Sequence, residues 1–268
     1  MSDPDRISKV IVCATCYADA SQIISLGSII ANWAESELAG VLVQEEDYLA
    51  SFGTKTSRMM TYVGLPVEAA TDQNFQSISS ADAKAFETAL KRSALSDLRA
   101  WTFSCSRGEV SKESLSLAQR DSIVLIGHRR LNRFASTLLL VCGIEIECTE
   151  AIRLTVSLAA KLGASITPIS FDAPHNEPSR EAVLLQELCQ AAHVHVEPLR
   201  FVPSKMAILE AVNRSTALAL VTNAGTGITS TVPDLQQLRM AARCPIILVG
   251  KQAHDLTTAE NNVDRAHS

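Results

Sequence analysis

The same order of predicted elements occurs twice in this chain. Residues 9–44 and residues 137–171 each run from an apolar segment through a polar turn into an amphipathic segment, and then through a short turn into a second apolar segment. Continuous β-branched runs predict buried strands, and apolar residues at steps of three and four predict a helix. Strand, helix and strand are expected to form a right-handed crossover between parallel strands. The repetition therefore predicts two α/β units of similar design.

The length of the chain fits two such units, because 268 residues suffice for two domains of about 100–150 residues each. We expect a first module over residues 1–135, with four strands and a long insert at residues 45–80. A second module with five strands is expected over residues 136–252, followed by a polar tail over residues 253–268. The predicted fold class is α/β, with two tandem open parallel sheets packed as a pseudo-dimer. The last helix and strand of the second module have no counterpart in the first.

Composition argues against several classes of protein. The chain is 47 % hydrophobic with a net charge of −5, and it has no long run of Lys and Arg of the kind that nucleic-acid binding requires. No apolar stretch approaches the roughly 18–20 residues needed to cross a bilayer, and the N-terminal segment lacks a signal-peptide core. We therefore expect a cytoplasmic protein with neither a nucleic-acid nor a membrane partner. Its seven cysteines are expected to be reduced thiols packed as small hydrophobes.

Ligands of doubly wound sheets bind outside the carboxyl ends of the strands, so the candidate residues are sought there. In the first module these ends carry a hydroxyl, a glycine, a histidine and three arginines, namely Thr15, Gly127, His128, Arg107, Arg129 and Arg130. The three guanidinium groups predict a clamp for a phosphate or a carboxylate. The alternative is that they pair with Glu45, Glu46 and Asp47 on a solvated rim.

Cys13 and Cys16 have the spacing C-x-x-C. With Cys105 and His128 at neighbouring strand ends, they are candidates for a zinc site or a redox dithiol. Cys13, however, lies inside a predicted strand, whereas a redox C-x-x-C usually opens a helix. Buried structural thiols are therefore favoured, and no metal is expected.

A glycine-rich turn follows the fourth strand of the second module. Candidate ligand-binding residues in this turn and at the end of the module's first strand are Cys142, Gly143, Asn223, Gly225, Thr226, Gly227, Thr229 and Ser230. Backbone N–H groups in such a turn can hold a phosphate or another anion. The alternative is a tight turn at a strand exit that needs glycine for positive φ.

The last strand is preceded by Arg243, Cys244 and Pro245, and this ending, with the order of elements before it, resembles the universal stress protein family. The resemblance covers most of residues 9–251 if the two units are taken as a tandem. It implies a role in stress response and binding of an adenine nucleotide, which would be ATP, ADP or AMP. In ATP-binding members an Asp at the end of the first strand meets the adenine. The matching residues here are Thr15 and Cys142, and neither supplies a carboxylate.

The second part of the family's nucleotide site is a glycine motif after the fourth strand, and it is shortened here. Val232 and Pro233 stand where its final Gly-Ser falls. We therefore expect a non-enzymatic regulator of the stress response, with the second module as the more complete pocket, and with a protein partner or a second copy forming a homo-oligomer such as a dimer. The alternative is an interaction scaffold whose nucleotide pockets are vestigial. A weak ATPase ranks third, since no base or metal-binding carboxylate pair is placed at the phosphates.

Overall fold

The computed structural model describes residues 7–45, 59–60, 66–67, 72–118, 121–128, 135–142, 148–170 and 180–250. The first half of the chain contributes β1 (Lys9–Ala14), α1 (Tyr17–Ala34), β2 (Glu37–Gln44), β3 (Met59–Met60), β4 (Pro66–Val67), α3 (Asp72–Ser96), β5 (Trp101–Arg107), α4 (Val110–Leu117) and β6 (Ser122–Ile126). The second half contributes β7 (Thr137–Cys142), α5 (Thr149–Leu162), β8 (Ser165–Ser170), α6 (Arg180–Ala191), β9 (Arg200–Phe201), α7 (Lys205–Arg214), β10 (Ala219–Asn223), the short 3₁₀ helix η1 (Gly227–Thr229), α8 (Val232–Ala241) and β11 (Ile246–Val249).

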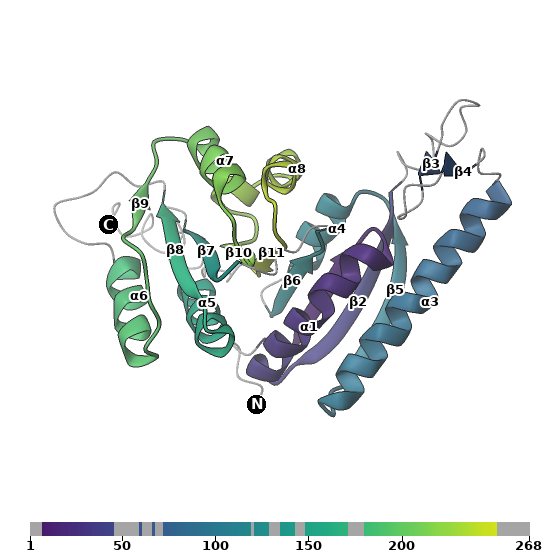
Figure 1. The fold of residues 1–268 in the computed structure, drawn as a ribbon, viewed down its shortest axis with the longest axis horizontal. Coiled ribbons are helices and arrows are strands. Elements are labelled where there is room, and N and C mark those ends of the chain that lie inside the picture. The colour runs from purple at the N-terminus through teal and green to yellow at the C-terminus, as the bar shows by residue number, and fades with distance from the viewer. Residues whose placement is uncertain are drawn as a thin grey trace, which may run out of the picture.

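One nine-stranded sheet runs through both halves, in the order β5-β2-β1-β6-β11-β10-β7-β8-β9 (Figure 1). The strands from β5 to β6 are parallel to one another, and so are those from β11 to β9. β6 and β11 pair antiparallel, with Ile126 opposite Ile246. The predicted α/β fold with parallel sheets is thus confirmed. The domain limits and the pseudo-dimeric relation of the two modules stay predictions.

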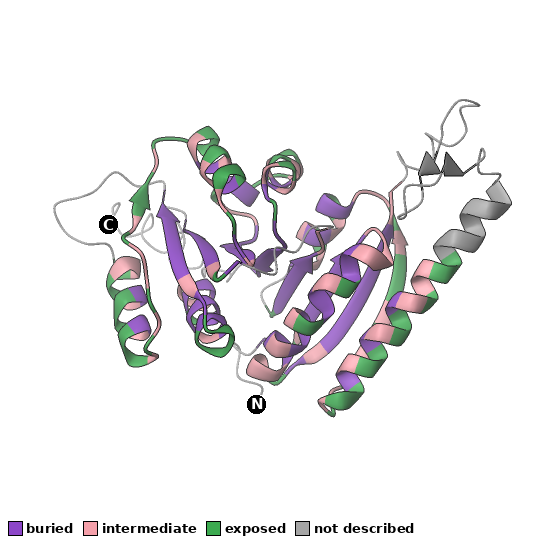
Figure 2. Ribbon diagram, viewed as in Figure 1, coloured by how far each residue is buried: buried purple, intermediate pink, exposed green. Residues whose placement is uncertain are grey.

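β1 shows why helices cover both faces of the sheet. Val10 and Val12 point into the core beneath α1, α3, α5 and α6, whereas Ile11 and Cys13 point into the core beneath α4, α7 and α8. Figure 2 shows the inner strands buried between helices whose outer surfaces are exposed, whereas the edge strands β5 and β9 are largely exposed themselves. Parallel strands covered on both faces need near-continuous apolar sequence, which is the pattern that predicts them.

Two elements differ from the sequence-based expectation. The apolar spacing of residues 81–98 predicts a helix that starts at residue 81, but α3 begins at Asp72, inside the predicted insert, which also holds the short antiparallel pair of β3 and β4. The sequence likewise predicts a strand over residues 194–201, but β9 covers only Arg200–Phe201, and Val196 adds one isolated bridge to Ile166. Pro198 stands between them and has no N–H to donate, which accounts for the interruption at this sheet edge. The rest of the insert and the tail at residues 253–268 lie outside the described residues.

Candidate functional site

A cavity of about 600 Å³ lies at the carboxyl ends of β1 and β6. Thr15, Gly127 and His128, three of the residues predicted for the first module, line it. Because β11 runs antiparallel to β6, the start of β11 and the end of α8 reach the same edge of the sheet. Both halves of the chain therefore line this space, which we call the junction cavity. Its volume falls within the range of roughly 300–1,000 Å³ typical of small-ligand sites.

Asp19 supplies a carboxylate to the junction cavity. The Thr15 hydroxyl donates to Asp19 Oδ2 over 3.2 Å, and Asp19 is only 7 % exposed. The chain is extended at Cys16 and becomes helical at Tyr17, so Asp19 lies in the first turn of α1. Unpaired N–H groups at a helix start favour a negative charge there. The carboxylate that the sequence lacks at position 15 is therefore present one helical turn further along.

Gly127 sets the distance between β6 and α1. Its N–H donates to the Cys13 carbonyl over 2.9 Å, which continues the strand pairing by one residue. A Cβ atom at position 127 would lie 3.0 Å from the backbone carbonyl carbon and oxygen of Asp19. Only glycine lets the end of β6 approach the start of α1 this closely.

Two arginines from the second half reach the junction cavity, and their surroundings differ. Arg239 lies 3.8 Å from Glu45 and donates to the Ser111 hydroxyl over 3.1 Å, so it ties α8 to the end of β2 and to α4. Arg243, in the connection between α8 and β11, is exposed, and among the described residues its side chain has no hydrogen bond or ion pair. Burial raises the pKa of the neighbouring Cys244 thiol to about 12, so this thiol is uncharged at physiological pH.

Of the three arginines predicted for the first module, Arg107 is the one within the described residues, and it lies away from this cavity. Arg107 ends β5, the outer strand of the sheet, where it lies opposite Gln44 on β2. Two strands separate β5 from β6, so Arg107 is remote from Gly127 and His128. Arg129 and Arg130 lie outside the described residues.

The predicted metal candidates lie apart from one another. Cys13 points toward α4 and accepts a hydrogen bond from the Ser114 hydroxyl at 3.4 Å, whereas Cys16 immediately precedes α1. Burial raises the pKa of the Cys13 thiol to about 11, which keeps it protonated and unreactive. Cys105 is exposed on the edge strand, and His128 lines the junction cavity. Within the described ranges no group of three or more His, Cys, Asp or Glu side chains is arranged to hold a metal ion.

The glycine-rich turn of the second module is held by its own side chains. Thr229 is buried, and its hydroxyl lies 2.6 Å from the Asn223 carbonyl and 2.9 Å from the Thr226 carbonyl. The same oxygen accepts from the Thr226 N–H at 3.3 Å. Gly225 and Gly227 have φ values of 69° and 51°, the left-handed region that glycine tolerates. Six of the eight residues predicted for the second module lie in this turn, between the end of β10 and the start of α8, namely Asn223, Gly225, Thr226, Gly227, Thr229 and Ser230.

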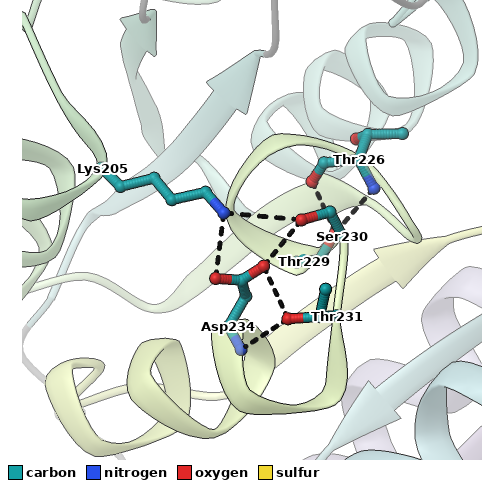
Figure 3. Close-up of polar contacts among 6 residues, drawn as sticks. All are labelled: Lys205, Thr226, Thr229, Ser230, Thr231 and Asp234. Carbon is teal, nitrogen blue, oxygen red and sulfur yellow. Dashed lines mark hydrogen bonds and ion pairs between the residues drawn. The ribbon is translucent and has the colours of Figure 1, made fainter.

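A carboxylate of the chain itself occupies the start of α8. Asp234 accepts from the hydroxyls of Ser230 at 2.6 Å and Thr231 at 2.8 Å, and its other oxygen lies 2.9 Å from Lys205 Nζ (Figure 3). The hydrogen bond from Ser230, with those from Lys205 and Thr231, lowers the pKa of Asp234 to about 2 despite partial desolvation. Hydroxyls, an ammonium group and a helix start are the groups that would bind a phosphate. Here they converge on Asp234.

The remaining two predicted residues of the second module lie at the end of β7. Cys142 is buried and shares a hydrogen bond with Cys148. This hydrogen bond and the burial both raise the pKa of the Cys142 thiol well above its usual range. The Asn223 amide donates to Cys148 Sγ at 3.4 Å, so this end of β7 is tied to the end of β10. Gly143 lies outside the described residues.

Asp19, Arg243 and Asp234 are absent from the residues predicted from the sequence. A local signal exists for Asp19, which is four residues beyond Thr15 at the start of a predicted helix. Asp234 likewise stands three residues after Thr231, the spacing of a helix cap. No local pattern points to Arg243, because its position depends on the pairing of β6 with β11.

The fold described here is that of the universal stress proteins. A universal stress protein from Archaeoglobus fulgidus DSM 4304 aligns with 92 % of this chain and 98 % of its own, with a TM-score of 0.50 and 10 % sequence identity. A putative universal stress protein from Pseudomonas aeruginosa UCBPP-PA14 aligns with 92 % of this chain and 94 % of its own, with a TM-score of 0.43 and 11 % identity. No protein-family model and no curated protein matches the sequence. The likeness to the Archaeoglobus protein confirms, at the level of the fold, the resemblance found in the sequence.

Among the helices that the structure describes, none combines the length and the apolar character that a membrane crossing requires.

Proposed function

We propose that this chain is a non-enzymatic, cytoplasmic regulator of the stress response that binds an adenine nucleotide in the junction cavity. The observation that carries the proposal is the position of Asp19, buried beside Thr15 at the end of β1. The universal stress protein fold supports the assignment to stress regulation, and the cavity at the carboxyl ends of β1 and β6 is where such a fold binds ligands.

Asp19 is suited to an adenine because its carboxyl group lines the cavity. Carboxylate oxygens accept hydrogen bonds, and the exocyclic amino group of an adenine donates them. The Thr15 hydroxyl donates a hydrogen bond to Oδ2 of Asp19. This bond holds the Asp19 side chain in place in the cavity wall, which both residues line. Gly127 leaves the space beside Asp19 open, because any side chain there would begin 3.0 Å from the Asp19 backbone.

The glycine-rich turn of the second module is the weaker candidate for a phosphate. A phosphate bound at the start of α8 would have to displace Asp234 from Ser230, Thr231 and Lys205. Otherwise the phosphate would lie beside the negative charge of the Asp234 carboxylate. Like charges at that distance repel strongly. We therefore place the nucleotide in the junction cavity, although the sequence favours the second module.

An interaction scaffold without a nucleotide is the second candidate function. It is favoured by the same Asp234 contacts, since a turn whose donors are satisfied internally has no need of a ligand. Under this alternative the protein would act through a protein partner or a second copy. Weak ATPase activity ranks third and would appear as slow release of phosphate from ATP.

The test is thermal unfolding of the full chain with AMP, ADP or ATP. At 100 times its Kd a ligand stabilises the fold by about 2.7 kcal/mol, which corresponds to roughly 5–10 °C for a chain of this size. Asp19→Ala should weaken binding about ten-fold or more, because hydrogen bonds to charged groups contribute about 1.5–3 kcal/mol. The shift at the same nucleotide concentration should then fall by at least half.

Glu210→Ala is the matched control, because Glu210 lies on α7, outside the cavity lining, and pairs at the surface with Arg214, 3.2 Å away. This variant should keep the full shift. If none of the three nucleotides raises the melting temperature of the wild-type chain, the binding function is refuted and the scaffold is favoured.

A further inference from the structure

The second half of the chain closes the junction cavity. α8 ends at Ala241, and the connection to β11 passes along the cavity with Arg243 and Cys244 in its lining. Ile246, the first residue of β11, pairs with Ile126, the last residue of β6. The antiparallel pairing of the two strands therefore fixes this connection opposite Thr15 and Asp19, which belong to the first half.

The charges of the cavity lining leave one cation available. Arg239 is engaged with Glu45 and Ser111, so its charge is largely balanced by a neighbouring carboxylate. Arg243 is exposed at the cavity and has no partner among the described residues. A guanidinium group presents five donors in a planar fork that matches the oxygens of a phosphate. Its cost of desolvation is also lower than that of an ammonium group.

The cavity lining thus offers two chemically different groups. Asp19 is a buried acceptor at the start of α1 in the first half of the chain, and Arg243 is a cationic donor in the second half. A ligand that contacts both must carry a hydrogen-bond donor and a negative charge. A nucleoside monophosphate has both, whereas inorganic phosphate has only the anionic part.

We infer that Arg243 binds the phosphate of the nucleotide whose base contacts Asp19, so that the two halves of the chain together form one composite site. This inference rests on the proposed function and adds to it the residue that recognises the phosphate. The site is incomplete in either half alone, because the base-binding carboxylate and the phosphate-binding guanidinium come from different halves. Phosphate-bearing ligands should therefore bind more tightly than the free nucleoside.

The test is isothermal titration of the full chain with AMP and, separately, with adenosine. Arg243→Gln should weaken the binding of AMP about ten-fold and leave that of adenosine within about two-fold, because only the phosphate contact is lost. Arg243→Lys keeps the charge without the fork and should recover part of the affinity for AMP. Because Arg243 is exposed and has no partner within the described ranges, the melting temperature of the unliganded variants should match that of the wild type.

Arg214→Gln is the matched control. Arg214 is an exposed arginine on α7 that does not line the cavity, so this substitution removes the same charge outside the proposed site. It should bind AMP like the wild type. If wild type and Arg243→Gln bind AMP equally, the role of Arg243 is refuted while the proposed function stands. If wild type binds neither AMP nor adenosine, the proposed function itself is refuted, and this inference falls with it.

Discussion

At the scale of single residues, two aspartates near helix starts have opposite roles. Asp19 in α1 faces the junction cavity, whereas Asp234 in α8 is surrounded by Ser230, Thr231 and Lys205. Both positions favour a negative charge because of the helix start. What separates them is their setting, because Asp19 lines a cavity of about 600 Å³, whereas Asp234 is held by the side chains of Ser230, Thr231 and Lys205. Asp234 therefore stabilises the fold, and we propose Asp19 as the residue that contacts a ligand.

The pH dependence of stability should reveal the role of Asp234. Its pKa of about 2 in the folded chain lies below the value of about 3.9 usual in an unfolded one. The ionised side chain thus stabilises the fold above about pH 4, and this contribution disappears as the pH falls through about 2. Because solvent screens the partly exposed group, we expect Asp234→Asn to lower the free energy of unfolding by only about 1 kcal/mol at pH 7.

Urea unfolding of wild type and Asp234→Asn at several pH values between 7 and 3 measures this difference. It should be constant above pH 5 and shrink toward pH 3. Glu210→Gln, which removes a carboxylate from a surface ion pair, should change little at any of these values. A difference for Asp234→Asn that does not vary with pH would mean that its charge has no part in stability.

At the scale of elements, the contact between the end of β6 and the start of α1 shapes the junction cavity. Gly127→Ala would place a methyl group 3.0 Å from the Asp19 backbone, so α1 or β6 must shift. We expect the free energy of unfolding to fall by about 1–3 kcal/mol, as in other overpacked sites. Binding of AMP should weaken as well, because Asp19 moves with α1. Calorimetric unfolding and titration with AMP measure the two effects.

Gly163→Asn is the control for this substitution. Gly163 ends α5 with a φ of 63°, and a Cβ atom added there meets no atom within 4 Å. Asparagine tolerates this conformation, so the cost should stay below about 1 kcal/mol. Equal costs for the two variants would contradict a special role of the contact between Gly127 and Asp19.

The sequence predicts the elements better than it predicts the site. Apolar runs and helical spacing place β1, β6 and α5 within a few residues, because these patterns reflect burial on local faces. Proline explains the interrupted β9 only after its position at the sheet edge is known. The site depends on which strands become neighbours. Thr15 and Gly127 are predicted from strand ends, but Arg243 reaches them only through the pairing of β6 with β11.

At the scale of the whole molecule, the order of the strands at the middle of the sheet explains why both halves of the chain line the junction cavity. Next to β6, where a fifth strand of the first half would lie, the sheet continues with β11 of the second half. The connection that precedes β11 is thereby brought to the carboxyl end of β1. One sheet shared by both halves thus makes a cavity that neither half forms alone.

Hydrogen–deuterium exchange of the full chain with and without saturating AMP tests the central claim most directly. We predict that AMP slows exchange in both halves of the chain, since residues of both line the junction cavity. The protected segments should be Thr15 to Asp19 and the surroundings of Gly127 in the first half, and Arg239 to Cys244 in the second. Exchange between Asn223 and Thr231, in the glycine-rich turn, should stay unchanged. Protection confined to that turn, or to only one of the two halves, would contradict a composite site between the halves.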